Sequence, residues 1–236
     1  MQYDNMYYRT AYEQHFQRLD EISAALGRKD LYTQAHGGRV ALYAIRLAQR
    51  LGFSPEGIRH IGLGGLFHDV GKLAMSDQIL ANRETQLSSE LRQEVRCHPL
   101  IGAALLKPVP FLEPVVDFVL FHHEREDGQG YPFGLNAEEI PPGAKIVSIA
   151  DCFDAVTTDR IYQKGQSAAV ACQVLRDGCD GNFNKAFVDV FIQEIEANGM
   201  IQGVGPDPRL ADRLVRSLAG LRRLPKDVWA AGVEAT

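Results

Sequence analysis

Two adjacent histidines, His122 and His123, run directly into an acidic, glycine-rich segment that ends in Gly130-Tyr131-Pro132. Neighbouring residues on a helix point about 100° apart, so two adjacent imidazoles can reach two metal ions or hold one ion from two sides. The segment that follows cannot stay helical, because glycine loosens the backbone and proline disfavours the helical region for Tyr131. The sequence therefore predicts a metal-binding helix end followed by a shaped loop, as a metal-assisted hydrolase needs beside its substrate.

Further candidate ligands stand in or beside apolar segments whose spacing is helical. His68 and Asp69 follow an apolar run that ends at Phe67, and Asp151 ends a third apolar run. Imidazole and carboxylate together suit first-row metals such as iron, manganese and zinc rather than calcium. Seven such ligands are too many for one ion and predict two ions that share a bridging ligand. The candidate metal ligands are His36, His68, Asp69, His98, His122, His123 and Asp151.

The order and spacing of these residues resemble those of an HD-GYP domain. That family is the metal-dependent phosphodiesterase branch of the HD superfamily and cleaves cyclic di-GMP. The resemblance covers roughly residues 30 to 195, and it implies an all-α fold: a helical bundle with a long loop rich in glycine and proline beside the metal site. The residues that carry it are His68-Asp69 with Gly71-Lys72, the run from His122 to Pro132, and Ala150-Asp151 with Phe153, Asp154, Ala155, Asp159, Arg160 and Tyr162.

Apolar periodicity and capping residues predict helices almost throughout, with one long loop over residues 127–143. Ser54 and Ser88 are expected to cap helices. We expect three parts. Residues 1–29 would form an N-terminal helix, packed on the core or acting as a reduced regulatory element. Residues 30–200 would form the catalytic domain, and residues 201–236 a C-terminal helical extension.

Composition limits the classes of partner and compartment. The chain has 236 residues, a net charge of −5 and no block rich in lysine or arginine, which argues against a protein that binds duplex nucleic acid. No apolar run is long enough to span a bilayer, and the N-terminus is not a signal peptide. The four cysteines show no CxxC pairing and are expected to be free thiols. These features together predict a cytoplasmic protein without a membrane partner.

The ligand set suggests a mechanism as a hypothesis. One ion would be bound by His36, His68 and Asp151, the other by His98, His122 and His123, and Asp69 would bridge them. Two such ions would share a water, lower its pKa and present hydroxide in line with the phosphodiester phosphorus. Lys72 follows His68 by four residues. If the helix continues, Lys72 is expected to lie on the same helical face as His68. There it would hold the hydroxide or a phosphate oxygen.

Other residues are expected to act around this centre. Arg160 is expected to clamp a phosphate, with Lys164 and Tyr131 as further substrate contacts. Asp127 and Asp154 are expected to orient ligands from behind. Glu124 and Glu126 are more typical of a solvent-exposed loop surface than of a binding site.

The chain departs from the family pattern at two places. Some relatives resemble a three-metal arrangement in which a glutamate one turn before the first histidine binds the extra ion, and Tyr32 stands at that position here. We therefore expect two ions, and linear pGpG rather than GMP as the main product. A proline and a second basic residue usually follow the arginine, whereas Ile161 to Gln163 follow here and Lys164 comes next. Phosphate binding is then weaker or shifted by one residue.

The resemblance predicts hydrolysis of cyclic di-GMP to pGpG, possible onward conversion to GMP, and iron or manganese as the cofactor, with zinc, nickel or cobalt as alternatives. A mixed cyclic GMP-AMP fits the same residues. A receptor that binds a cyclic dinucleotide without turnover, or a module that binds a diguanylate cyclase (GGDEF) domain, is an alternative. Another is a general HD-type nucleotide phosphohydrolase, which needs only His36, His68, Asp69 and Asp151 and leaves three histidines unexplained.

Overall fold

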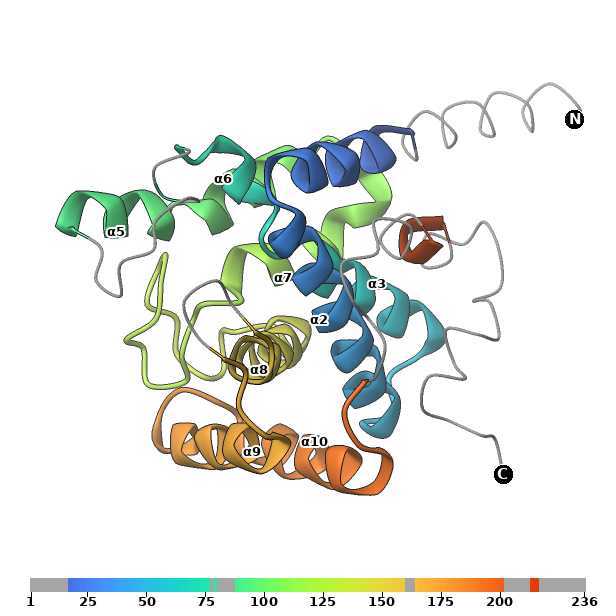
Figure 1. The fold of residues 1–236 in the computed structure, drawn as a ribbon, viewed down its shortest axis with the longest axis vertical. Helices are drawn as coiled ribbons and strands as arrows, with labels where there is room; N and C mark the ends of the chain where they lie inside the picture. The colour runs from blue at the N-terminus through green and yellow to red at the C-terminus, as the bar shows by residue number, and fades with distance from the viewer. Residues whose placement is uncertain (1–16, 77–78, 80–87, 160–163, 202–212, 217–236) are drawn as a thin grey trace, which may run out of the picture.

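The computed structural model describes residues 17–76, 79, 88–159, 164–201 and 213–216. Within these ranges every extended regular element is a helix, and strand-like pairing is confined to a single bridge between Asp127 and Asn136. The expected all-α class is therefore confirmed. Figure 1 shows the arrangement, with α8 seen nearly end-on between the α2–α3 pair and the α9–α10 pair.

The helices begin and end close to where caps and apolar periodicity place them. A first helix covers residues 17–29 of the described chain, within the expected N-terminal helix at residues 1–29. The side chains of Ser54 and Ser88 accept the predicted capping hydrogen bonds. The α-helices that follow are α2 Leu31–Arg50, α3 Pro55–Phe67, α5 Ser89–Arg96, α6 His98–Leu106, α7 Glu113–Phe121, α8 Pro142–Thr157, α9 Ala168–Asp177 and α10 Lys185–Asn198, with short 3-10 helices at Val70–Ala74, Pro110–Leu112 and Gly178–Asp180.

The close contact of α2 with α3 depends on glycine. A Cβ added at Gly65 on α3 would lie 2.9 Å from the Cα of Ala41 on α2, which is closer than real side chains approach a backbone. The two helices can therefore pack backbone against backbone only because this position lacks a side chain. This packing brings His36 of α2 next to the C-terminal end of α3, where His68 follows.

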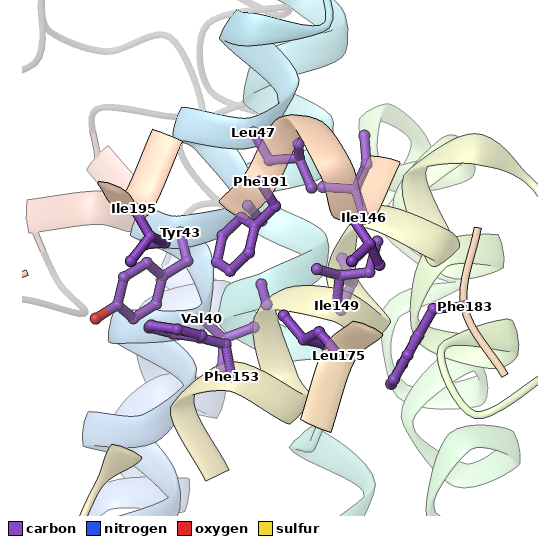
Figure 2. Close-up of a cluster of buried hydrophobic side chains, with 14 of the residues drawn as sticks. Val40, Tyr43, Leu47, Ile146, Ile149, Phe153, Leu175, Phe183, Phe191 and Ile195 are labelled. Atoms are coloured by element: carbon purple, nitrogen blue, oxygen red, sulfur yellow. The ribbon is translucent and has the colours of Figure 1, made fainter. Parts of the chain in front are cut away.

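An aromatic cluster joins α8 and α10 to α2 (Figure 2). The rings of Tyr43, Phe153 and Phe191 meet edge to face, with centroid separations of 5.0 to 6.0 Å. Such contacts add about 0.5–1.5 kcal/mol per pair to the stabilisation from burial. Because α2 and α8 carry His36 and Asp151, this cluster fixes the spacing of two candidate ligands.

A second buried cluster includes segments from both ends of the described chain. Leu19 from the first helix and Leu214 and Val215 from residues 213–216 are fully buried within it, and Arg216 forms an ion pair of 3.4 Å with Asp20. The expected domain boundaries at residues 30 and 200 stay a prediction. Most of the expected C-terminal helical extension, residues 201–236, lies outside the described residues.

Across the described ranges, no helix combines the length and apolar character needed to cross a bilayer. The four cysteines carry free thiols, as predicted.

Candidate metal centre

All seven predicted ligands converge on one region of the interior. The donor atoms of His36, His68 and Asp69 lie within 4.8 Å of one another and form a first group, and those of His98, His122 and His123 do the same and form a second group. Three of these side chains sit at helix ends, where His68 caps α3, His98 begins α6 and His122 caps α7, whereas His36 and Asp151 lie within α2 and α8. Helices from distant parts of the sequence thus supply the two groups.

The carboxylate of Asp69 lies between the two groups. Its Oδ2 is 3.4 Å from Nε2 of His68 and 4.0 Å from Nε2 of His36, whereas its Oδ1 is 3.3 Å from Nε2 of His98. Each oxygen therefore faces a different group, as a bridging ligand requires. Asp151 completes the first group, because its Oδ1 lies 3.0 Å from Nε2 of His36 and 3.8 Å from Nε2 of His68.

Three imidazoles are anchored in the same way through their Nδ1 atoms. His68, His98 and His122 each direct Nδ1 to the backbone carbonyl three residues earlier, at 2.8, 2.7 and 2.7 Å. A carbonyl oxygen only accepts, so Nδ1 carries the proton and Nε2 presents its lone pair. This is the arrangement by which metal-binding histidines are usually oriented.

His36 is anchored by a charged side chain. Its Nδ1 lies 2.7 Å from Oδ2 of Asp154, and Arg39 donates to both oxygens of Asp154 at 2.7 and 2.9 Å. All three side chains are buried. Asp154 thus occupies the orienting position expected for it. Arg39 had no predicted role, although its place one turn after His36 was a usable signal in the sequence.

Burial sets the protonation of the second group. It lowers the pKa of His98 to about 4 and that of His123 to about 3, and it lowers the pKa of His122 well below its usual value. These imidazoles are therefore neutral near pH 7 and able to donate lone pairs to a metal.

In the first group, neighbouring charges and hydrogen bonds outweigh the effect of burial on the pKa values. Burial alone would lower the pKa of His36, but hydrogen bonds with Asp151 and Asp154 outweigh it and raise the pKa to about 9. Burial would raise the pKa of Asp151 and of Asp69. The hydrogen bond from His36 holds the pKa of Asp151 well below its ordinary range, and the charge of Lys72 does the same for Asp69.

The turn that carries Asp69 is tightly packed against α6. A Cβ added at Gly71 would lie 1.9 Å from the backbone oxygen of His98, so only glycine allows this approach. Asp69 itself has φ −95° and ψ 6°, in the sparsely allowed bridge region where many active-site residues sit. The two ligand-bearing segments are thereby brought into contact.

Lys72 does not lie on a continued helix, so the expectation of a shared helical face with His68 is wrong. The α-helix ends at Phe67, and Lys72 falls in the 3-10 helix Val70–Ala74. Its Nζ instead lies 2.5 Å from Oδ2 of Asp69. The tighter turn still places the ammonium at the edge of the centre, with 27% of the side chain exposed.

The long loop after His123 is fixed by a residue whose role was predicted incorrectly. Glu124, expected on a solvated face, is buried and accepts hydrogen bonds from the backbone N–H groups of Phe133 and Leu135 at 2.7 and 3.0 Å. Tyr131 in this loop stacks on His123, with ring centroids 4.7 Å apart and planes 23° apart. The loop is thus held against the metal ligands.

Two further expectations need correction. Asp127 does not orient a ligand histidine, because its carboxylate accepts from Arg125 at 3.0 and 2.6 Å and from the N–H of Gln129. Lys164 is 89% exposed, pairs with Asp159 at 2.8 Å and is not among the residues that line the cavity beside the centre. Arg160 lies outside the described residues.

The donor atoms fit divalent metal ions. Nε2 of His68 is buried and has no hydrogen-bond partner in the described part of the chain, although it carries a lone pair. Such a group is costly unless something satisfies it. A metal ion would satisfy it, because neutral imidazoles and ionised carboxylates are the ligands that iron, manganese and zinc accept.

A cavity of about 370 Å³ opens beside the centre. Two of the candidate ligands, His123 and Asp151, line it together with Tyr131 of the long loop. It is therefore the space in which a substrate bound at the centre would lie.

Comparison with known proteins agrees with this geometry. The family model described as HD domain matches residues 13–183. The chain is 38% identical over 193 residues to a cyclic di-GMP phosphodiesterase of Pseudomonas aeruginosa, covering 75% of this chain and 46% of that protein. It is 33% identical over 183 residues to a cyclic di-GMP phosphodiesterase response regulator of Xanthomonas campestris, covering 77% and 48%. The chain spans about half the length of these relatives.

Solved structures share the fold. An HDGYP-type protein from Bdellovibrio bacteriovorus superposes with a TM-score of 0.59 at 22% identity, covering 80% of this chain and 63% of that one. A cyclic GMP-AMP phosphodiesterase of Vibrio cholerae superposes with a TM-score of 0.58 at 19% identity, covering 89% and 55%. At these identities the similarity establishes the helical architecture alone.

Proposed function

Because the chain belongs to the HD-GYP branch of the HD domain family, we propose that it is a metal-dependent phosphodiesterase that hydrolyses cyclic di-GMP to linear pGpG. The observation that carries the proposal is the position of Asp69, whose two oxygens face two separate groups of imidazoles. A general HD-type phosphohydrolase has no use for the second group, which consists of His98, His122 and His123.

The residues present would hold two ions. His36, His68 and Asp151 would bind one, the three remaining histidines would bind the other, and Asp69 would contact both. Such ions supply an activated water and positive charge for the phosphate oxygens. Iron and manganese suit this donor set, with zinc, nickel or cobalt as alternatives.

The side chains around the centre would prepare it for a phosphodiester. The ammonium of Lys72 stabilises the ionised form of Asp69 and, from its place at the solvent edge, can donate to a phosphate oxygen. The Glu124 carboxylate holds the loop so that Tyr131 covers His123 and excludes water from that side. Arg39 and Asp154 keep His36 in a single orientation.

The substrate class follows from the relatives. Some of them are named for cyclic di-GMP and others for 3'3'-cGAMP, so a cyclic dinucleotide is common to both groups. Cyclic di-GMP is preferred here because the two relatives described above carry that name. Tyr32 replaces the carboxylate expected to bind a third ion, which favours a reaction that stops at pGpG. A cytoplasmic location and a GGDEF partner stay predictions.

The test is anaerobic purification, metal quantification, and incubation with cyclic di-GMP followed by chromatography of the products. About two equivalents of iron or manganese together with pGpG are expected. Ligand that is retained but not cleaved by metal-loaded protein would replace the proposal with a receptor. Hydrolysis of nucleoside triphosphates without action on cyclic di-GMP would replace it with a general nucleotide phosphohydrolase.

A further inference from the structure

The cavity beside the metal centre has a cationic wall that neither the ligand set nor the family resemblance accounts for. Besides His123 and Asp151, its lining includes two arginines, Arg96 and Arg125. Asp151 supplies the one carboxylate on the described lining, and it faces His36. Apart from the two candidate ligands, the charged side chains on the described lining are cationic and therefore suited to an anionic group.

Arg96 is placed on this wall by a stack of rings. It is the last residue of α5, and its guanidinium carbon lies 4.7 Å from the centroid of the Tyr131 ring. The stack continues inward, because Tyr131 also packs on His123 at 4.7 Å. A guanidinium over an aromatic ring gains about 0.5–1 kcal/mol at an exposed site, which orients Arg96 without occupying its N–H donors. Figure 1 shows α5 next to the long loop.

The neighbouring cations are already paired. Arg125 makes two hydrogen bonds to Asp127, which balance its charge. Lys164, expected to contact phosphate, pairs with Asp159 and lies off the cavity lining. Arg96 lines the cavity and has no ion pair among the described residues, so its charge is not balanced by a carboxylate there.

We propose that Arg96 binds the second phosphate of a cyclic dinucleotide, the one that is not cleaved. This inference rests on the proposed function, because it needs the first phosphate at the metal centre. With one phosphate there, the rest of a ring that carries two phosphates must extend into the adjoining cavity, where Arg96 presents a planar donor fork that matches phosphate geometry. Arg96 is thus a substrate-binding residue on a helix that contributes no metal ligand.

The test compares two substrates in metal-loaded protein. Cyclic di-GMP carries a second phosphate, whereas bis(p-nitrophenyl) phosphate carries only the one that is cleaved. Arg96→Ala should raise KM for cyclic di-GMP by about 10- to 100-fold, as expected for lost hydrogen bonds to a charged group, and leave kcat within about twofold. Its kcat/KM for bis(p-nitrophenyl) phosphate and its metal content should stay at the wild-type level.

Two matched variants sharpen the result. Arg92→Ala removes the same charge from α5 one turn earlier, off the cavity lining, and should leave KM unchanged. Arg96→Lys keeps the charge but loses the planar fork and the stacking, so its KM should fall between those of wild type and Arg96→Ala. Equal rises in KM for Arg92→Ala and Arg96→Ala would overturn the proposal, because they would show a general charge effect.

The outcomes separate this inference from the proposed function. Wild type that cleaves cyclic di-GMP, with KM unchanged in Arg96→Ala, overturns the role of Arg96 alone. Parallel losses on both substrates also overturn it, because they would place the effect at the metal centre. Wild type that cleaves bis(p-nitrophenyl) phosphate but neither cleaves nor binds cyclic di-GMP overturns the proposed function itself, and the inference with it.

Discussion

Oδ2 of Asp154 lies 2.7 Å from Nδ1 of His36, so a carboxylate buried on α8 orients an imidazole on α2 from behind the metal centre. Arg39 holds that carboxylate with two hydrogen bonds of its own. The sequence separates His36 and Asp154 by more than a hundred residues, and the aromatic cluster between α2, α8 and α10 fixes their distance. Core packing and ligand geometry are therefore coupled in this protein.

The Asp154→Asn variant tests that coupling. The amide weakens the hold on His36 and leaves Arg39 buried without a charge partner. We expect metal affinity to fall by about 10- to 100-fold and the free energy of unfolding to fall by about 3 kcal/mol. Competition with a chelator and denaturant unfolding measure the two effects. Asp127→Asn is the matched control, because Asp127 bonds Arg125 rather than a histidine, and equal losses of metal affinity in both variants would refute the assignment.

Asp69→Ala tests the bridge between the two groups. Both groups lose a ligand at once, so we expect the metal content to fall from about two ions per chain to below one, with phosphodiesterase activity lost. The far-UV circular dichroism should stay helical, because α3 ends before this residue. Metal quantification by mass spectrometry decides the point. Full occupancy by both ions would mean that Asp69 bridges nothing.

Glu124→Ala should release the loop without touching the ligands. The two backbone N–H groups at Phe133 and Leu135 lose charged acceptors, each worth about 1.5–3 kcal/mol. We expect hydrogen exchange at these two amides to accelerate by about tenfold or more, with metal content unchanged. Glu138→Ala, at an exposed position in the same loop, serves as the control. Unchanged protection in Glu124→Ala would show that other contacts hold the loop.

Lys72→Ala should separate turnover from metal binding. The ammonium 2.5 Å from Asp69 supplies positive charge at the edge of the centre but is not a ligand. We expect kcat to fall by about 100-fold, comparable to the loss of one donor to a charged transition state. Metal content measured on the same preparation should match wild type. A variant that turns over at the wild-type rate would remove Lys72 from the mechanism.

Three of the candidate ligands could be located from the sequence because they stand at helix ends. Helix ends are marked by caps, glycine and proline, so the histidines at 68, 98 and 122 could be placed on helix termini from their neighbours in the sequence. Their grouping depended on resemblance to a known family, since spacing along the chain does not show which helix ends meet. The 3-10 turn at Lys72 was missed because a short change of helix type leaves no periodic signal.

The residues whose roles the sequence did not predict depend on contacts that the hydrophobic pattern does not show. Glu124 looks like an exposed loop acid until the loop folds back and brings two N–H groups onto its carboxylate. Asp127 forms an ion pair with Arg125, two residues away, and therefore does not contact the ligand histidines. Arg96 lies on a helix without a buried residue, and its position beside the cavity depends on its stacking over the Tyr131 ring.

Tyr32 offers a test of how many ions the centre accepts. It stands one helical turn before His36, and the two rings are nearly parallel, at 8° with centroids 6.1 Å apart. Tyr32→Glu would place a carboxylate where some relatives are expected to bind an extra ion. We expect the metal content to rise from about two to about three ions per chain and GMP to appear beside pGpG. Tyr32→Phe keeps the ring without the carboxylate and should retain the wild-type metal content and product. If Tyr32→Glu binds no additional metal, the residue at this position does not set the number of ions.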